Sequence, residues 1–178
     1  DSIRIALIGQ PNVGKSTVFN MLTGLNQHVG NWPGKTVEFK MGHLTIENTS
    51  IQLVDLPGTY SLTANSTEER VARDFIIHEK PDLVIAIVNA ASLERNLYLV
   101  TELLALNVPL VIGLNMMDVA DQQGFTIDAK VLQAALGITV VPLIASKNQG
   151  LKTLITLSKD LAKNQQAFNP NQPKISNE

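Results

Sequence analysis

The fold is decided by Gly9-Gln10-Pro11-Asn12-Val13-Gly14-Lys15-Ser16, which has the form G-x-x-x-x-G-K-[ST] of a phosphate-binding loop. An unbroken apolar run at 3–8 precedes this loop, and a helical pattern over about 15–23 follows it. In a strand, loop and helix of this order, successive backbone N–H groups and the positive end of the helix face a polyphosphate. A glycine-rich turn before an ordinary helix is the alternative, and the loop alone indicates only a nucleotide.

The composition describes one globular domain. The 178 residues suit a single core, and a hydrophobic share of 44% excludes a disordered chain. Fourteen basic and sixteen acidic residues leave a net charge of -2, which argues against broad binding of nucleic acid. No cysteine is present, which excludes disulfides and thiolate metal sites and fits a reducing compartment. The longest apolar runs are far too short to span a bilayer, so we expect a soluble chain.

Short apolar runs alternate with helical patterns, which indicates an α/β fold. The runs at 3–8, 83–88, 110–114 and 140–144 predict parallel strands covered on both faces, with the last at an edge because Pro142 cannot donate to a neighbour. Charged, alternating segments at 37–40 and 45–48, followed by 51–54, predict an edge hairpin. Helices are predicted at about 15–23, 67–79, 93–106, 128–136 and 151–163, the second opened by a capping box of Ser66 and Glu69.

These elements predict a six-stranded, mostly parallel sheet with one antiparallel edge strand and helices on both faces. Residues 1–163 form this domain in our interpretation. Residues 164–178 are rich in Asn, Gln, Pro and Ser and are interpreted as a polar linker.

Two further motifs contain the side chains expected at a nucleotide. The apolar segment 51–54 ends in Asp55-Leu56-Pro57-Gly58, where the carboxylate can hold magnesium through a water and the Gly58 amide can reach a γ phosphate. Asn115-Met116-Met117-Asp118 follows the run 110–114, at the end of the strand where parallel sheets place ligand contacts. An Asp in a Pro-Gly turn, and an Asn and Asp that cap a helix, are the corresponding structural alternatives.

Asp118 favours GTP over ATP. Its carboxylate can accept from guanine N1–H and from the exocyclic amine, whereas adenine offers no such pair of donors and leaves the carboxylate unpaired. A weaker motif, Ala145-Ser146-Lys147 after the last strand, would offer the Ala145 amide to guanine O6.

These elements, in this order and spacing, resemble the G1, G3, G4 and G5 boxes of Ras-like P-loop GTPases of the translation-factor class. Thr36 fits the missing G2 threonine. More narrowly, the segments VGNWPGKTVE (29–38), DLPGTYSL (55–62) and SLERNLY (92–98) are similar to the cytoplasmic G domain of the bacterial ferrous-iron transport protein B (FeoB) family, over about residues 3–162. In that family a helical domain and a polytopic membrane portion follow, which implies a fragment at the cytoplasmic face of the inner membrane. A homo-oligomer formed through the membrane portion is compatible with this resemblance.

The resemblance assigns the site residues. Magnesium is expected on Ser16, Thr36 and Asp55, and the catalytic groups are expected to be Lys15, Asn12, Thr36 and Gly58. GTP or GDP is expected to contact Gly9, Asn12, Val13, Gly14, Lys15, Ser16, Thr17, Gly34, Thr36, Asp55, Gly58, Asn115, Met116, Asp118, Ala145 and Ser146.

Three positions depart from the Ras pattern. Met116 replaces the lysine of Asn-Lys-x-Asp, which predicts weak nucleotide affinity with fast release. Thr59 stands where Ras has the glutamine that orients the attacking water, so hydrolysis is expected to be slow. Asn12 suggests a bound potassium ion beside the β and γ phosphates, because related GTPases with this asparagine use one; fixing of the loop conformation is the alternative.

The segment 25–36, rich in Gly and Asn, is predicted to be the mobile first switch with Trp32 exposed, and 58–67 the second switch. A buried, immobile Trp32 is the alternative. The three histidines, His28, His43 and His78, are interpreted as surface residues rather than as iron or zinc ligands.

The predicted function is GTP hydrolysis that gates ferrous-iron uptake. Two rival functions stay open: a free-standing GTPase that acts in tRNA modification or ribosome assembly, and a GTP-dependent binding module whose turnover matters little.

Overall fold

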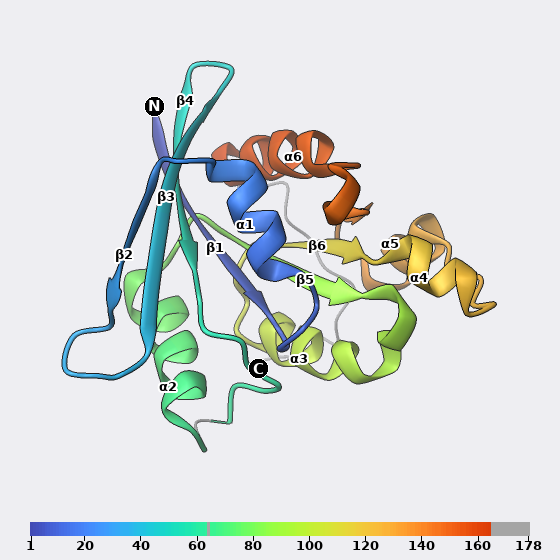
Figure 1. Cartoon of the computed structure of the whole chain (residues 1–178), viewed down its shortest axis with the longest axis horizontal. Coiled ribbons are helices and arrows are strands. Elements are labelled where there is room, and N and C mark those ends of the chain that lie inside the picture. The colour runs from blue at the N-terminus through green and yellow to red at the C-terminus, as the bar shows by residue number, and fades with distance from the viewer. Residues whose placement is uncertain (64, 165–178) are drawn as a thin grey trace, which may run out of the picture.

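Seven strands form one sheet in the computed structural model, which describes residues 1–63 and 65–164 (Figure 1). The strands lie in the order β2 (Gln27–Asn31), β3 (Glu38–Ile46), β4 (Thr49–Asp55), β1 (Ser2–Gly9), β5 (Leu83–Asn89), β6 (Leu110–Asn115) and β7 (Val140–Pro142). Strands β4, β1, β5, β6 and β7 are parallel to one another, whereas β3 is antiparallel to both β2 and β4. As predicted from Pro142, β7 lies at an edge.

The predicted count of six strands and one antiparallel edge strand is wrong. Residues 38–40 and 45–46 of these segments belong to one long strand, β3, which turns into β4 through Glu47 and Asn48, both with positive φ. The additional strand is β2, which lies inside the predicted first switch. Four of its five residues are exposed, so the sequence there lacks the apolar pattern of a core strand.

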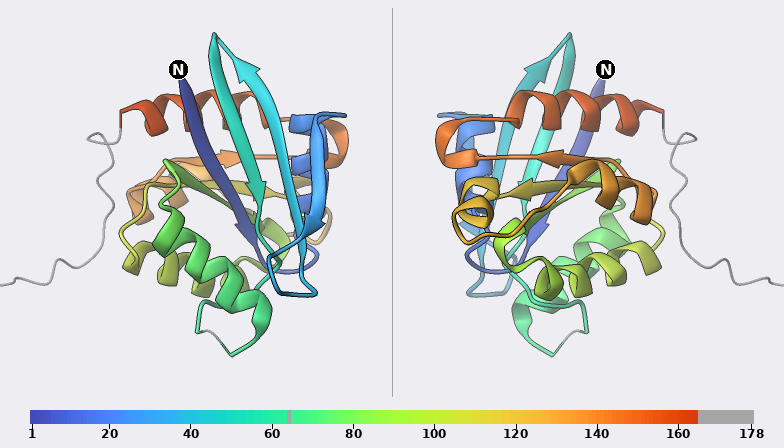
Figure 2. Two further views of the ribbon diagram at one scale, coloured as in Figure 1. Left: turned by 90° about the vertical axis from the view of Figure 1, so that its left-hand side faces the viewer. Right: turned by 90° about the vertical axis from the view of Figure 1, so that its right-hand side faces the viewer.

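Helices cover both faces of the sheet (Figure 2). Helix α1 (Lys15–Thr23) and helix α6 (Leu151–Lys163) pack on one face, and α2 (Thr67–Asp74) and α3 (Leu93–Ala105) cover the other. Helix α5 (Ala129–Leu136) packs beside β7. Short 3₁₀ turns occur at Ala90–Ser92 and Ala145–Lys147.

The predicted helix at 67–79 consists of two parts. It begins at the predicted cap, where the Ser66 hydroxyl accepts from the Glu69 N–H at 3.1 Å. After α2, the chain forms one π-helical turn, η1 (Phe75–Glu79). This helical segment ends at Lys80, which has a φ of 47°. Helix α4 (Met117–Gln122) was not predicted, because its six residues are too few for a helical period.

Strand β1 separates two apolar clusters. Leu7 points into the cluster under α1 and α6, while Ile8 points into the cluster under α2 and α3, and both side chains are fully buried. This burial on both faces explains the unbroken apolar run at 3–8 and confirms its interpretation as a central strand. The run also directs β1 into the phosphate loop at its carboxyl end.

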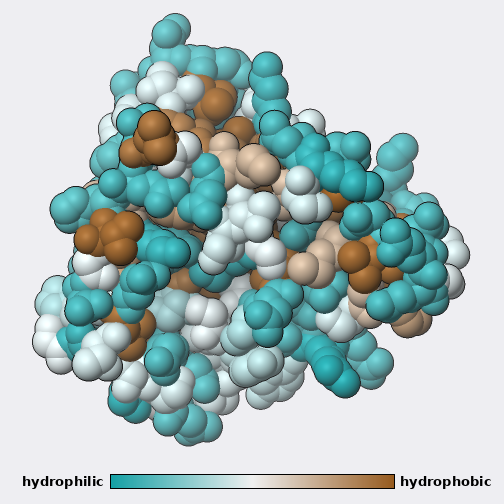
Figure 3. All heavy atoms as spheres, viewed as in Figure 1, coloured by the Kyte–Doolittle hydropathy of each residue, from teal (hydrophilic) through white to brown (hydrophobic). Residues whose placement is uncertain are grey.

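The surface seen in Figure 3 is mostly hydrophilic, with hydrophobic side chains scattered over it in small groups. Within the described part of the chain, no helix is long and apolar enough to cross a membrane. The predicted linker at 164–178 lies outside the described residues, apart from Asn164.

Candidate nucleotide-binding site

The phosphate loop joins the end of β1 to the first turn of α1. Asn12 and Gly14 have positive φ, 68° and 89°, so the loop curls at these two residues. A Cβ on Gly14 would lie 2.4 Å from the Asn115 Nδ2, and one on Gly9 would lie 2.8 Å from the Ile87 carbonyl oxygen. Both glycines are therefore required by the close approach of neighbouring atoms, and Gly14 also by its left-handed backbone.

The loop surrounds a cavity of about 490 Å³. Its lining residues are Gln10, Pro11, Asn12, Gly14, Lys15, Ser16 and Gly58. The first turn of α1 and the second-switch glycine thus meet at one cavity, although 42 positions separate Ser16 from Gly58. Val13 is buried below the loop, and Thr17 is half-buried in the first turn of α1.

Lys15 connects the loop to the end of β4. Its ammonium forms an ion pair with Asp55 and donates to the Leu56 carbonyl oxygen at 2.7 Å. Burial raises the pKa of the Asp55 carboxyl, and the charge and hydrogen bond of Lys15 partly offset that rise. One cation, which lines the cavity, and one buried carboxylate are therefore held together at the phosphate loop.

Asn115 links the two ends of the site. Its Nδ2 donates to the Val13 carbonyl oxygen at 2.9 Å, and its Oδ1 accepts from the Ala145 N–H at 3.0 Å. The phosphate loop and the loop after β7 are thereby joined through a buried side chain at the end of β6. Because the Ala145 amide already donates to Asn115, a contact with guanine O6 would have to share this donor.

Asp118 lies in the first turn of α4, beside that same loop. Its carboxylate is 26% exposed, and Lys147 Nζ lies 4.0 Å from it. Met116 precedes α4 with a φ of 62°, and Ser146 is exposed. The side chains predicted to read the base therefore lie, like the phosphate loop, at the carboxyl ends of the parallel strands.

Gly34 and Thr36 are not part of this constellation. Both are exposed, and neither lines the phosphate cavity. They lie in a turn between β2 and β3 that is closed by hydrogen bonds from Trp32 N–H to Val37 O and from Lys35 N–H to Trp32 O, each 2.9 Å. The structure thus brings together the residues of four motifs and leaves the predicted first-switch ligands apart from them.

Comparison with known proteins identifies the family of this arrangement. A family model described as ferrous iron transport protein B matches residues 3–157. The Fe(2+) transporter FeoB of Escherichia coli strain K12 is 46% identical over 156 residues, which are 85% of this chain and 20% of that protein. The FeoB G-domain from Methanococcus jannaschii is 47% identical with a TM-score of 0.82, covering 92% of this chain and 99% of that one. The cytosolic domain of T. maritima FeoB in GDP form II is 38% identical with a TM-score of 0.91, covering 99% of this chain and 68% of that one.

The chain belongs to the FeoB family. It matches the P-loop GTPase domain of that family and spans 20% of the length of its E. coli relative. The predicted family and fold are thereby confirmed.

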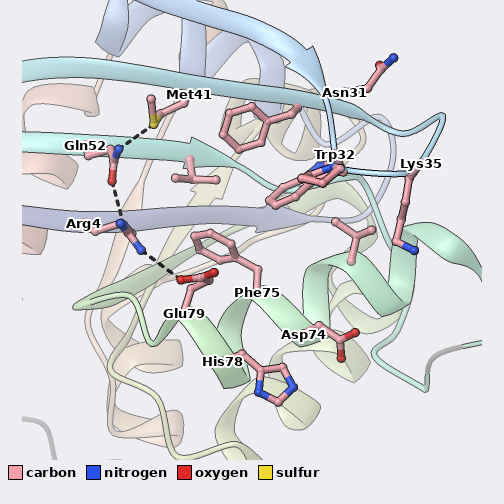
Figure 4. Close-up of a pocket in the computed structure, with 14 residues that line it drawn as sticks. Arg4, Asn31, Trp32, Lys35, Met41, Gln52, Asp74, Phe75, His78 and Glu79 are labelled. Carbon is pink, nitrogen blue, oxygen red and sulfur yellow. Dashed lines mark hydrogen bonds and ion pairs between the residues drawn. The ribbon is translucent and has the colours of Figure 1, made fainter.

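In this FeoB domain the predicted exposure of Trp32 is wrong. The side chain is half-buried and packs on Phe39 and Phe75, beside a cavity of about 650 Å³ between the β2–β3 ribbon and α2 (Figure 4). Polar groups line the far side of this cavity, where Arg4 Nε donates to Gln52 Oε1 at 2.7 Å.

Two carboxylates bind the segment predicted to be the second switch, and only the capping box of Glu69 with Ser66 was predicted from the sequence. Glu102 accepts from the Leu62 N–H with both oxygens at 3.2 Å. The hydroxyls of Ser61, Thr63 and Ser66 lower the pKa of Glu69 by donating to it. Bonds to backbone and to local hydroxyls follow no fixed spacing, so the only signal in the sequence was the capping box.

The three histidines form no ligand cluster in the structure. Within residues 1–63 and 65–164, no group of three His, Cys, Asp or Glu side chains could hold a metal ion.

Proposed function

We propose that this chain is the GTP-binding and GTP-hydrolysing domain of a longer ferrous-iron transporter, and that the state of its nucleotide gates iron uptake. The observation that supports this best is Asn115, which joins the phosphate loop to the loop beside Asp118. Phosphate and base recognition are thereby held in one rigid unit, as a guanine nucleotide would need. The T. maritima relative was solved in a GDP form.

Magnesium would be held by Ser16, Thr36 and Asp55, with Asp55 acting through a water. The donor set fits this ion, because hydroxyl and carboxylate oxygens are the ligands that magnesium prefers. Lys15 contacts only Oδ1 of the buried Asp55 carboxylate, so Oδ2 lies outside that ion pair and could accept from a magnesium-bound water. When bound, the ion would neutralise charge on the β and γ phosphates.

The residues of the chain would contribute positioning and charge to hydrolysis. A water attacks the γ phosphorus, and the bond from that phosphorus to the bridging β oxygen breaks, which gives GDP and phosphate. Lys15 and the loop amides would stabilise the negative charge that develops. The Gly58 amide and the backbone at Thr59 would place the water, since Thr59 is held to the loop by its N–H, which donates to the Gly9 carbonyl oxygen at 3.0 Å.

Potassium is proposed as an activator through Asn12. This residue is exposed at the rim of the phosphate cavity, so its side-chain amide oxygen can turn toward a cation there. The measurement is GTP turnover in potassium and in sodium, and we expect a higher rate in potassium. Equal rates in wild type, or the same potassium effect in Asn12→Ala, would remove this role.

A helical and a membrane domain of the same longer protein are the proposed partners, at the cytoplasmic face of the inner membrane. The domain would act as a switch for iron permeation. The family match disfavours a free-standing GTPase of tRNA or ribosomes. Single-turnover hydrolysis with and without the downstream domains separates an enzyme from a binding module, which would bind GTP without appreciable hydrolysis in either form.

The decisive experiment is a titration with fluorescent GTP and ATP analogues, in wild type and in Asp118→Asn. We expect wild type to prefer GTP, and the variant to lose about tenfold or more of that preference because a charged hydrogen-bond acceptor is removed. Lys147→Ala is the matched control, since it removes the neighbour of Asp118 and leaves the acceptor in place. A wild-type chain that binds both nucleotides equally would overturn the proposal.

A further inference from the structure

Trp32 ties the turn between β2 and β3 to the helix that follows the second switch. Its ring centroid lies 4.8 Å from that of Phe39 at an interplanar angle of 85°, and 5.8 Å from that of Phe75 at 72°. Both contacts are edge-to-face, which is a favoured geometry for aromatic pairs. Phe75 is the first residue of η1, directly after α2, so the contact joins the predicted first switch to the helical segment that follows the predicted second switch (Figure 4).

Thr36 cannot leave its place independently of Trp32. The two residues share the short turn closed by the Trp32–Val37 and Lys35–Trp32 hydrogen bonds, and Val37 is buried at its base. Thr36 itself is exposed and does not line the phosphate cavity. For its hydroxyl to reach the loop at Ser16, this turn has to move, and the turn carries the Trp32 ring with it.

The packed position of Trp32 is only weakly favoured. The cavity of about 650 Å³ beside the ring leaves part of it without packing partners. In addition, the indole Nε1 is buried and has no hydrogen-bond partner within the described residues. A buried donor without a partner costs free energy, which opposes the gain from the two aromatic contacts.

We propose that Trp32 is a positioning residue of the GTPase cycle. Packed on Phe75, it holds the first switch away from the phosphate loop, and it leaves that contact when Thr36 approaches the nucleotide. The proposal rests on the proposed function for the reaction itself. The packing contact and the shared turn are independent of that assignment.

The first test is a disulfide across the base of the turn, made with Asn31→Cys and Glu38→Cys. These residues are cross-strand partners. The hydrogen bonds at Trp32–Val37 and Asn26–His43 fix the alternation of the ladder, which makes 31–38 a non-hydrogen-bonded pair with side chains close together. The chain has no other cysteine.

We expect the oxidised double variant to lose at least about tenfold in single-turnover GTP hydrolysis, because the bond holds the base of the turn on β3, in the position from which Trp32 packs on Phe39 and Phe75, and to regain it on reduction. The affinity for fluorescent GDP should stay the same in both redox states, which shows that the site is intact. An oxidised protein that hydrolyses GTP as fast as the reduced one overturns the proposal.

The second test is Trp32→Ala with added indole. Loss of the aromatic contacts should raise the single-turnover rate by about two- to tenfold, the range that one such pair can supply. Indole should refill the space and lower the rate toward that of wild type, whereas it should not affect wild type. An unchanged or lower rate in Trp32→Ala, with unchanged affinity for GDP, contradicts the proposal.

The experiments distinguish failure of the proposed function from failure of the Trp32 proposal. A wild-type chain that neither prefers GTP nor hydrolyses it contradicts the function. A wild-type chain that hydrolyses GTP while both sets of variants behave like it contradicts the role of Trp32 alone.

Discussion

Lys15 and Asp55 form an ion pair whose two side chains are 10% and 7% exposed. Replacing Lys15 by Met removes the charge that opposes the effect of burial, so the pKa of Asp55 in the folded state rises further above its usual value of 3.8. A carboxyl with a raised pKa keeps its proton in the native state, so the free energy of unfolding falls as pH rises from the unfolded value through the folded one. We therefore predict that Lys15→Met loses more stability, relative to wild type, at pH 8 than at pH 5.

The expected loss at pH 8 is about 3 kcal/mol, as for other buried pairs from which one partner is removed. Urea unfolding followed by circular dichroism at the two pH values measures it. The matched control is Lys15→Met with Asp55→Asn, in which the extra pH dependence should disappear. If the single and double variants show the same pH dependence, Asp55 is not the titrating group.

Gly14 supports a second prediction at this scale. Its φ of 89° disfavours any side chain, and a Cβ there would meet the Asn115 amide. Gly14→Ala should displace Asn115 and weaken binding of fluorescent GDP by about tenfold or more, since the joined loops separate. The control is Gly30→Ala, because a Cβ at Gly30 has nothing within 4 Å. Equal affinities for GDP in the two variants would show that the loop tolerates a side chain at Gly14.

Residues of fixed spacing were predictable, and residues defined by packing were not. The phosphate loop, Asp55, Gly58, Asn115 and Asp118 lie at one edge of the sheet, because each motif directly follows a strand in the sequence. The half-buried position of Trp32 depends on Phe39 and Phe75, which no local pattern connects to it. Glu102 likewise acts on a backbone amide 40 positions away.

Among the elements, α2 depends on Ser66, the residue that caps its N-terminus. Ser66 is extended, and its hydroxyl accepts from the Glu69 N–H, which satisfies one of the free donors at the start of the helix. Ser66→Ala should lower the free energy of unfolding by about 1 kcal/mol and speed amide hydrogen exchange in α2. Ser66→Asp keeps an acceptor and should behave like wild type. Equal exchange in α2 of the Ala and Asp variants would contradict the capping role.

Elements with an apolar pattern were predictable, and short or exposed ones were not. The buried strands β1, β5, β6 and the helices α1, α3, α5 and α6 were predicted within one or two residues. Strand β2 is defined by pairing with β3 rather than by burial, and α4 is too short for a periodic signal. The π-helical turn after α2 differs from an α-helical turn only in its backbone hydrogen bonds, so no side-chain pattern in the sequence indicates it.

The whole molecule should unfold as one unit, because β1 is shared by both apolar clusters. Leu7→Ala and Ile8→Ala remove side chains on opposite faces, and each should cost about 3 kcal/mol in the free energy of unfolding. We expect a single transition in both variants, by fluorescence and by circular dichroism. Val29→Ala is the control, since Val29 is 55% exposed and should change stability little. Two separate transitions in either core variant would show that the faces unfold independently.

At this scale the sequence predicted the fold class well and the sheet incompletely. The alternation of apolar runs and helices requires a parallel sheet with two covered faces, whatever the details of its edges. The antiparallel edge is specified by cross-strand pairs such as Gly30 with Phe39 in the β2–β3 hairpin, and the exposed β2 residues show no apolar pattern that would indicate this pairing.

The Asn115 side chain also limits how the specificity of this domain can be redesigned. The same side-chain amide bonds to Val13 in the phosphate loop and to Ala145 in the loop after β7. A substitution of Asn115 therefore alters the loops proposed to bind the phosphates and the base at the same time. A change of base preference is therefore better sought at Asp118, which stands outside that bridge and can be exchanged without loosening the phosphate end.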